Sequence, residues 1–391
     1  MKTIEPGATL GVMGGGQLGR MFVQAAQRLG YLTAVLDADP TSPAGGVAQY
    51  HIATPYLDEQ GLAQLMQRCQ AITTEFENVP AGALVTLGAY RRVAPTADTV
   101  AICQDRASEK ACFTRCGVPC APHALIDSDA GLAAVPDSLL PGILKTARLG
   151  YDGKGQRGVA SRADLAAAWQ ALGRAPCVLE QKLPLALELS VVVARGADGH
   201  TVHLPVQQNL HCDGILAVTQ VPAPDASAAL QQQAQDAATR LAAAIDYVGV
   251  LCVEFFVLAA DVPGLAGRLV ANEMAPRPHN SGHWSIDGSD VSQFDLQVRT
   301  LTGLPLPMPR QHSPAVMLNL LGDLWFDASG RERAPDWAAV LALPGVHLHL
   351  YGKANARPGR KMGHLTVTAT SAAAARATAL QAAARLGLPG F

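Results

Sequence analysis

The chain has few aromatic residues, no long apolar run and no strong excess of either charge. Aromatic side chains make up 5% of its 391 residues, and the formal net charge is −2. Without a basic excess, we expect no nucleic-acid partner. A membrane-spanning helix needs about 20 consecutive apolar residues, and no segment approaches that length, so we expect no membrane span. The length suffices for two or three domains with a large core.

The first 16 residues lack the apolar core and cleavage site of a signal peptide, so we expect a cytoplasmic location. Eight cysteines in so long a chain do not indicate a disulfide framework. Cys112, Cys116 and Cys120 are spaced four residues apart, but no tight C-x-x-C pair accompanies them. Buried apolar thiols explain them better than a metal site does.

Lysine is scarce as well, with seven residues in the whole chain. Four of the seven lie in glycine-bearing or polar stretches: Lys145, Lys154, Lys353 and Lys361. A lysine in such a stretch is better explained as a phosphate contact than as a solubilising charge. This distribution indicates a ligand that carries phosphate.

A short apolar strand over Thr9–Met13 runs into a glycine-rich turn and a helix. The turn matches G-x-G-x-x-G and an acid follows about 20 residues later, as in the dinucleotide fingerprint: Gly14, Gly16, Gly19 and Asp37. Glycine amides at a helix N-terminus bind any ligand phosphate. We therefore place phosphate or ribose binding ahead of an unliganded turn, and NAD binding behind both.

Strand and helix signals then alternate as in a parallel, doubly wound α/β domain. The third strand ends in TTEFENVP, which puts Glu75, Glu77 and Asn78 at a carboxyl edge of the sheet. Ligands of open α/β sheets bind at that edge. We prefer a binding role for these residues over a merely solvated strand end.

Lys145 lies inside an apolar strand, which is unusual unless its ammonium group reaches a partner. The segment after it, RLGYDGKGQRG, is rich in glycine and adds Lys154 and Arg157. Such a loop can close over phosphates and exclude water. It lacks the G-K-[ST] ending of a Walker A loop. The alternative is a flexible hairpin turn, but the nearby Lys145 favours phosphate.

Two apolar runs, Val250–Val257 and Leu269–Met274, predict a hairpin with a long glycine-bearing loop. Each run carries one carboxylate, Glu254 or Glu273. Burying two unpaired carboxylates is costly, whereas two acids facing one cleft suit Mg²⁺, which completes its shell with water and phosphate oxygens. The alternative is an ion pair between Glu273 and Arg277.

Taken in order, the motifs around Lys145, GYDGKGQ, EQKL, ELS, Glu254 and NEMAPRPHNSGH resemble those of ATP-grasp enzymes. GGGQLGRM, TEFENV, QDR and the closing YGKANARPGRKMGH narrow the resemblance to the N5-carboxyaminoimidazole ribonucleotide synthetases, the ATP-dependent carboxylases of bacterial purine biosynthesis. The match runs from about Gly11 to His364. One departure is EQKL, residues 180–183, here called the hinge, because the family is more hydrophobic after the glutamate. The departure concerns only the expected contact between Lys182 and adenine.

The resemblance implies a mixed α/β and α+β protein with the ATP-grasp fold. Its N-terminal domain, residues 1–118, would be doubly wound and biotin-carboxylase-N-like. Residues 119–196 would form a small lid domain, and residues 197–391 a C-terminal α+β domain that carries the metal acids and the basic closing motif. The resemblance also implies a homodimer.

The resemblance further assigns residues to ligands. The Lys145 ammonium and the glycine loop would hold the phosphates of ATP, the hinge would line adenine, and two Mg²⁺ ions would bind Glu254 and Glu273. The implied ATP contacts are Arg106, Lys145, Gly150, Tyr151, Asp152, Gly153, Lys154, Gly155, Gln156, Glu180, Gln181, Lys182, Leu183, Glu188, His211, Asn272 and Glu273.

The second substrate would be an aminoimidazole ribonucleotide, carboxylated with bicarbonate. Its implied contacts are Gly15, Gln17, Leu18, Glu75, Asn78, Tyr151, Arg277, His279, Lys353 and Arg360. The cations of the closing motif fit a 5′-phosphate better than a basic surface turn. The implied catalytic residues are Lys145, Tyr151, Asp152 and Arg277. Asp152 or Tyr151 would help remove the amine proton, with His279 as a rival.

Three other functions compete with an ATP-dependent carboxylase. A nucleotide-dependent oxidoreductase would explain the first glycine turn but would leave the acid pair and the second glycine loop without a role. A non-catalytic nucleotide sensor would need the metal acids or Lys145 to be lost, and they are present. Within the ATP-grasp group, the nearest rival is a formate-dependent glycinamide ribonucleotide transformylase.

Overall fold

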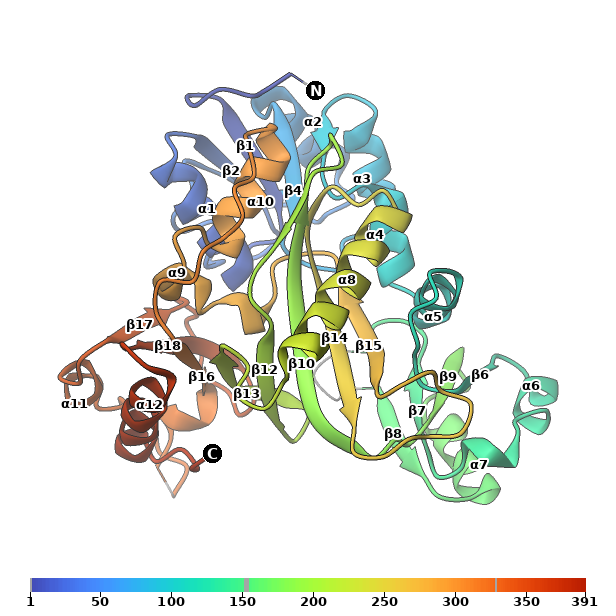
Figure 1. Ribbon diagram of the computed structural model, residues 1–391. Coiled ribbons are helices and arrows are strands. Elements are labelled where there is room, and N and C mark those ends of the chain that lie inside the picture. Colours follow the sequence, from blue (N-terminus) through green and yellow to red (C-terminus); the bar gives the residue numbers. More distant parts are fainter. Residues whose placement is uncertain (1, 151–154, 328) are drawn as a thin grey trace.

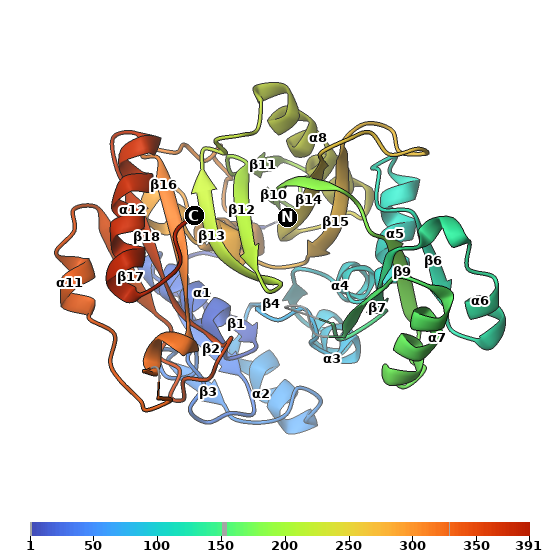
Figure 2. The same cartoon turned by 90° about the horizontal axis from the view of Figure 1, so that it is seen from below.

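The computed structural model describes residues 2–150, 155–327 and 329–391, which build three β-sheets (Figures 1 and 2). The first sheet is parallel, with strand order β3-β2-β1-β4-β5. Its strands are β1 Thr9–Met13, β2 Leu32–Leu36, β3 Tyr50–Ile52, β4 Ala71–Thr74 and β5 Arg92–Val93. The strand order reverses between β1 and β4, where the crevice of a doubly wound sheet lies. The predicted N-terminal architecture is confirmed.

Helices connect the strands of this sheet: α1 Gln17–Arg28, α2 Glu59–Arg68 and α3 Ala81–Gly88. The pattern of residues 98–116 suits a single helix, but two helices form there. The structure has α4 Ala97–Cys103 and α5 Arg106–Arg115, with a break at Gln104 and Asp105. Asp105 caps α5, because its side chain accepts from Ser108 N at 2.9 Å. The break thus starts a new helix at Arg106.

A small antiparallel sheet follows, with strand order β6-β9-β7-β8. Its elements are β6 His123–Ile126, α6 Asp129–Ala133, η1 Asp137–Leu139, β7 Gly142–Thr146, β8 Gln156–Val159, α7 Arg162–Ala171 and β9 Cys177–Gln181. The sheet and its two helices project to one side of the molecule in both views (Figures 1 and 2). Lys145 is therefore placed on the strand between β8 and β9.

The largest sheet has nine strands in the order β15-β14-β10-β12-β13-β16-β18-β17, with β11 beside β10. Its strands are β10 Leu185–Arg195, β11 Thr201–His203, β12 Gln207–Cys212, β13 Ile215–Val221, β14 Gly249–Leu258, β15 Leu269–Ala275, β16 Ala315–Leu321, β17 Val346–Leu350 and β18 Lys361–Thr368. The helical elements are α8 Ala228–Ala244, η2 Asn280–Gly282, α9 Ser285–Gly288, α10 Gln293–Thr302, η3 Gly322–Trp325, α11 Trp337–Leu341 and α12 Ala372–Leu386.

Three helices fix this sheet in the molecule. α8 packs on β10 and β14 through an alanine-rich face, and α12 packs on β16 and β18. α10 contacts β10 and β14 as well as α1 and β4, so it joins the large sheet to the parallel one (Figure 1). Among the described residues, we find no helix with the length and apolar character needed to cross a bilayer.

Candidate active site

The predicted hairpin exists, and it puts the two acids side by side. β14 and β15 pair antiparallel, with Glu254 directly opposite Glu273. Burial and the charge of Glu273 raise the pKa of Glu254 to about 7. His279 Nε2 lies 3.2 Å from Glu254 Oε1. The expected proximity of the two carboxylates is therefore present.

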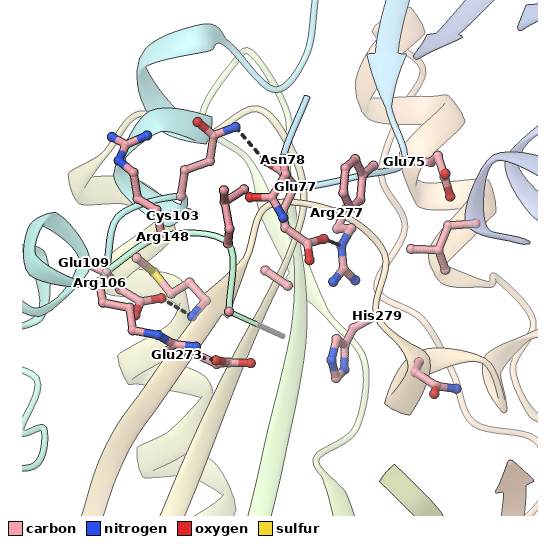
Figure 3. A pocket seen from close by; sticks show the side chains of 18 of the residues that line it. Glu75, Glu77, Asn78, Cys103, Arg106, Glu109, Arg148, Glu273, Arg277 and His279 are labelled. Atoms are coloured by element: carbon pink, nitrogen blue, oxygen red, sulfur yellow. Dashed lines mark hydrogen bonds and ion pairs between the residues drawn. The ribbon is translucent and has the colours of Figure 1, made fainter. Parts of the chain in front are cut away.

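The alternative ion pair between Glu273 and Arg277 does not form. Arg106 Nη1 donates to Glu273 Oε2 at 3.2 Å, whereas the partly buried Arg277 pairs with Glu77 (Figure 3). Burial opposes the charge on Arg277, but Glu77 and Glu75 raise its pKa above the ordinary value. Arg277 thus belongs to the crevice of the parallel sheet rather than to the acid pair.

The donor atoms near the acids are the kind that Mg²⁺ prefers. Asn272, next to Glu273, has a buried Oδ1 atom that meets no hydrogen-bond donor in the described part of the chain. Two carboxylates and an orphaned amide oxygen form an all-oxygen set. A divalent cation would relieve the repulsion between the two acids and satisfy that oxygen. The residues present therefore fit Mg²⁺.

Two cavities meet at Glu273. The first, here called the hinge pocket, has a volume of about 300 Å³ and contains most of the expected ATP contacts. These are Arg106, Lys145, Gln156, Glu180, Gln181, Lys182, Leu183, Glu188, His211, Asn272 and Glu273. Small-molecule sites have volumes of roughly 300–1,000 Å³. The structure thus gathers into one cavity residues that are spread over more than 160 positions.

The second cavity, here called the edge pocket, lies at the carboxyl edge of the parallel sheet and has a volume of about 320 Å³ (Figure 3). It contains six expected substrate residues: Gln17, Leu18, Glu75, Asn78, Arg277 and His279. Gly150, at the start of the glycine loop, lines it as well. Arg106, Glu273, His279, Asn280 and Lys361 line both cavities. A group held in one pocket can therefore reach a group held in the other.

Lys145 has the partner that its burial requires. Its Nζ donates to Glu180 Oε2 at 2.7 Å, and Lys110 Nζ lies 3.0 Å from Glu180 Oε1. All three side chains are buried. Burial opposes the charge on Glu180, but the two lysines lower its pKa to about 2. The carboxylate therefore holds the Lys145 ammonium group at the wall of the hinge pocket and also pairs with the fully buried Lys110, which is not in that wall as described.

Sequence reasoning missed Lys110, although a signal was available. Lys110 lies four residues after Arg106 on α5, so the two side chains share a helix face. Its Nζ also donates to the backbone oxygen of Asn272 at 3.0 Å. Lys110 therefore connects the helix, the hinge and the strand of the metal acids.

Glu188 and His211 lie on the neighbouring strands β10 and β12 and form an ion pair. Burial lowers the pKa of His211, but the hydrogen bond to Glu188 and the charge of Glu254 raise it above the ordinary value. Both side chains line the hinge pocket, as expected.

The first glycine turn does not present its amides to solvent. Glu75 accepts from Gly16 N at 2.8 Å and from Gly19 N at 3.1 Å, and Asp37 accepts from Gly15 N at 2.7 Å. A Cβ atom on Gly16 would lie 2.7 Å from Glu75 Oε1, so glycine is needed for the close approach of this acid. The protein's own carboxylates occupy these N–H groups, so Gly15, Gly16 and Gly19 have no free amide for the phosphate that we placed first or for the NAD that we placed last. Gly15, an expected substrate contact, lines neither pocket in the described ranges.

The closing basic motif divides into two parts. Lys353 Nζ donates to the Lys361 backbone oxygen and Arg360 Nη1 to the Asn355 backbone oxygen, each at 2.6 Å. Neither side chain is in the wall of the two pockets as described, whereas Lys361 is in the wall of both. The sequence analysis counted Lys361 among the cations of the closing motif but did not name it as a substrate contact.

Four expected residues of the glycine loop, Tyr151, Asp152, Gly153 and Lys154, lie outside the described residues. The loop's two described ends are anchored. Thr146 N donates to Gly155 O at 2.9 Å, and Gln156 pairs with Lys145 between β8 and β7.

The three sheets, the paired acids and the lysines at the hinge define an ATP-grasp enzyme. A family model described as the ATP-grasp domain matches residues 111–294. The ribonucleotide synthetase preATP-grasp domain matches residues 7–104, and the phosphoribosylaminoimidazole carboxylase C-terminal domain matches residues 315–378.

Curated relatives specify the enzyme further. N5-carboxyaminoimidazole ribonucleotide synthase from Brucella melitensis is 43% identical over 367 residues, covering 93% of this chain and 97% of the relative. The enzyme of that name from Pseudomonas aeruginosa is 40% identical over 359 residues, covering 92% and 94%. The chain belongs to the N5-carboxyaminoimidazole ribonucleotide synthase family and is an ATP-dependent ligase.

Solved structures agree with this assignment. The Staphylococcus aureus N5-carboxyaminoimidazole synthetase complexed with ADP is 35% identical and covers 99% of both chains, with a TM-score of 0.88. The Aspergillus clavatus synthase in complex with ADP and 5-aminoimidazole ribonucleotide is 32% identical, with a TM-score of 0.86, and covers 97% of this chain and 99% of its own. The predicted fold class and enzyme class are confirmed, and the oxidoreductase and sensor alternatives are excluded.

Proposed function

We propose that this chain uses ATP and bicarbonate to carboxylate the exocyclic amine of 5-aminoimidazole ribonucleotide, releasing ADP and phosphate. The product is N5-carboxyaminoimidazole ribonucleotide, an intermediate of purine biosynthesis. The observation that carries this proposal is the wall shared by the hinge and edge pockets, which includes Arg106, Glu273 and His279. A two-substrate transfer needs such a meeting point. The Aspergillus clavatus relative, solved with ADP and the ribonucleotide, supports it.

Bicarbonate must be activated because its carbon is a poor electrophile. Attack of a bicarbonate oxygen on the γ-phosphorus of ATP gives carboxyphosphate and ADP. The exocyclic amine then attacks the carboxyphosphate carbon, or CO₂ released from it within the closed site, and phosphate leaves. The protein contributes mainly positioning and charge neutralisation, and exclusion of water preserves the intermediate.

In this proposal the hinge pocket holds ATP. The ammonium group of Lys145, fixed by Glu180, neutralises phosphate charge on one side. Glu180, Gln181, Lys182 and Leu183 line adenine, and Glu188 with His211 binds the ribose side. Glu254, Glu273 and Asn272 would hold Mg²⁺, which neutralises phosphate charge when bound. The glycine loop, residues 150–156, closes over the phosphates.

The edge pocket holds the ribonucleotide. Arg277, which pairs with Glu77, and Lys361 are cations in its wall. Lys353 and Arg360 belong to the same closing motif as Lys361 and remain predicted phosphate contacts. Glu75 and Asn78 would face the ribose or the ring, with Gln17 and Leu18 beside them.

The amine proton has three predicted acceptors, Tyr151, Asp152 and His279. Burial and the positive charge of Arg277 keep the pKa of His279 well below its ordinary value, so its imidazole is neutral. A neutral imidazole between the two pockets suits a base better than a protonated one.

We also propose that the chain consists of three domains, residues 1–118, 119–196 and 197–391, and that it forms a homodimer.

Ribonucleotide-dependent ADP release in the presence of bicarbonate tests the proposal. We expect turnover only when ATP, Mg²⁺, bicarbonate and 5-aminoimidazole ribonucleotide are all present. Replacing bicarbonate by formate, with glycinamide ribonucleotide as acceptor, tests the transformylase alternative. Turnover in that second assay, without turnover in the first, would overturn the proposal.

A further inference from the structure

A cluster of three metal-ligand residues lies apart from the paired acids. Asp287 on α9, His349 on β17 and His364 on β18 each offer one ligand atom, and the three atoms lie within 4.8 Å of one another. His349 and His364 are register partners in the sheet, and α9 packs on β18 (Figure 1). None of the three lines the hinge or edge pocket in the described ranges. The reaction proposed above gives them no role.

The second observation is an unsatisfied nitrogen. His364 is fully buried, and its Nε2 finds no hydrogen-bond partner among the described residues. Its Nδ1 lies 3.0 Å from the Tyr351 hydroxyl. If Nδ1 carries the proton and donates it to that oxygen, Nε2 has a free lone pair. A buried acceptor without a partner is unusual in a folded protein.

The other two residues are already in contact. His349 Nε2 lies 2.8 Å from Asp287 Oδ2, and its ring stacks on that of His364 at a centroid distance of 4.5 Å. His347 Nδ1 is 3.7 Å from the other oxygen of Asp287. A hydrogen-bonded histidine–aspartate pair alone would explain Asp287 and His349, but it would leave His364 Nε2 unsatisfied.

We propose that Asp287, His349 and His364 form a binding site for a divalent transition-metal ion of the zinc type, with a fourth position open to water or to His347. Two imidazoles and one carboxylate suit Zn²⁺ rather than Mg²⁺, which prefers oxygen ligands throughout. Zn²⁺ bonds of roughly 2.0–2.2 Å require the donor atoms to draw together from their present spacing. On binding, the proton of His349 moves from Nε2 to Nδ1, so that the imidazole stays neutral, and the ion takes its place beside Asp287.

Such an ion would tie two parts of the chain together. α9 lies at the end of the segment matched by the ATP-grasp model, and β17 and β18 lie in the segment matched by the C-terminal model. β17 and β18 also flank the basic closing motif, and β18 begins with Lys361. His283, which lines the edge pocket, has its ring 4.9 Å from that of His364. The ion would therefore fix the base of the motif beside the edge pocket.

The test uses the full chain, free of any affinity tag and stripped of metal with a chelator, and Co²⁺ as a spectroscopic probe without ATP. We expect one Co²⁺ per chain with the visible absorption of a tetrahedral site, displacement by Zn²⁺, and a rise in Tm with Zn²⁺. His349→Asn and Asp287→Asn, checked for folding by circular dichroism, should each bind more than 10-fold more weakly.

Matched variants locate the ion. Glu254→Gln/Glu273→Gln and the exposed His312→Asn should keep the absorption band. Tyr351→Phe, which retains the ring but loses the partner of His364 Nδ1, should weaken binding roughly 10- to 100-fold. The proposal is overturned if His349→Asn binds Co²⁺ as the unchanged chain does. Loss of the band on changing Glu254 and Glu273 would also overturn it, because the ion would then sit at the paired acids.

Discussion

The hinge and edge pockets share a wall but are built in opposite ways. The hinge pocket lies between antiparallel sheets, and its buried acid, Glu180, is neutralised by two lysines. The edge pocket lies at the carboxyl end of a parallel sheet, and its acid Glu75 is held by the amides of the glycine turn. Burial raises the pKa of Glu75, whereas the lysines lower that of Glu180. The hinge pocket therefore offers the Lys145 ammonium group to a polyphosphate, whereas at the edge pocket the amides of Gly16 and Gly19 are already bonded to Glu75.

The largest expected effect is on the free energy of unfolding, and it comes from removing a lysine that pairs with Glu180. Lys110→Met leaves Glu180 with one cation and should destabilise the fold by about 3–5 kcal/mol, as expected for removing one partner of a buried ion pair. Urea unfolding without nucleotide measures this. Lys110→Met/Glu180→Leu should be no more stable than Lys110→Met, because it leaves the buried Lys145 ammonium group without its acid. Equal stability of Lys110→Met and the unchanged chain would contradict the account of this pocket.

Glu273→Gln tests the acids where the pockets meet. We expect kcat to fall by about 10²- to 10³-fold, the range found when one charge-stabilising group is removed. The circular dichroism spectrum should be unchanged, because the carboxylate serves chemistry. Steady-state ADP release over a range of Mg²⁺ concentrations measures it, with the exposed Glu332→Gln as a control. Normal turnover with unchanged Mg²⁺ dependence would remove Glu273 from the metal site.

Variants of three cations in the closing motif distinguish Lys361, which lines both pockets, from Lys353 and Arg360, which lie outside the pocket walls as described. Lys361→Ala should raise the KM of both ATP and the ribonucleotide, because the side chain lines both pockets. Lys353→Ala or Arg360→Ala should raise the ribonucleotide KM by roughly 10- to 100-fold, the value of a charge-assisted hydrogen bond, and change the ATP KM far less. Equal effects on both substrates in the Lys353 and Arg360 variants would place the motif outside the substrate site.

The smallest effect is a pH dependence at the hinge. Burial opposes the charge on His211, but Glu188 and Glu254 raise its folded-state pKa above the ordinary value of 6.5. A raised pKa gives stability that is fully present below pH 6.5 and lost as pH rises through the folded value. Urea unfolding at pH 6 and pH 8.5 should show this loss in the unchanged chain and less of it in His211→Asn. Parallel pH profiles of the two proteins would contradict it.

Local patterns allowed much of the fold to be predicted. The hairpin of Glu254 and Glu273, the parallel sheet and the antiparallel strand of Lys145 follow from apolar periodicity and glycine-bearing turns, which act over a few residues. The helix break at Asp105 was missed because the apolar pattern continues across it, although Asp is a strong N-cap residue. Most of the hinge pocket was predicted through motifs that resemble a known family.

The partners of charged side chains were not predictable in the same way. Arg277 was weighed as a partner for Glu273, but it pairs with Glu77, 200 residues away in the chain. Asp37 and Glu75 were read as ligand contacts, yet both accept from the glycine turn. These pairings depend on how α5, β4 and β15 pack, and no local pattern records that packing.

The sequence by itself determined which chemical groups are available: two acids on paired strands, a lysine in a buried strand, a glycine loop and a basic motif. Local hydrogen bonding and apolar periodicity specify such features, and the resemblance of their motifs to a known family indicated an ATP-dependent ligase. The tertiary structure alone decided which charges meet, that two cavities share one wall, and that Asp287, His349 and His364 converge behind it. The physical reason is that a charge is paired by proximity in space, which only the packed fold defines.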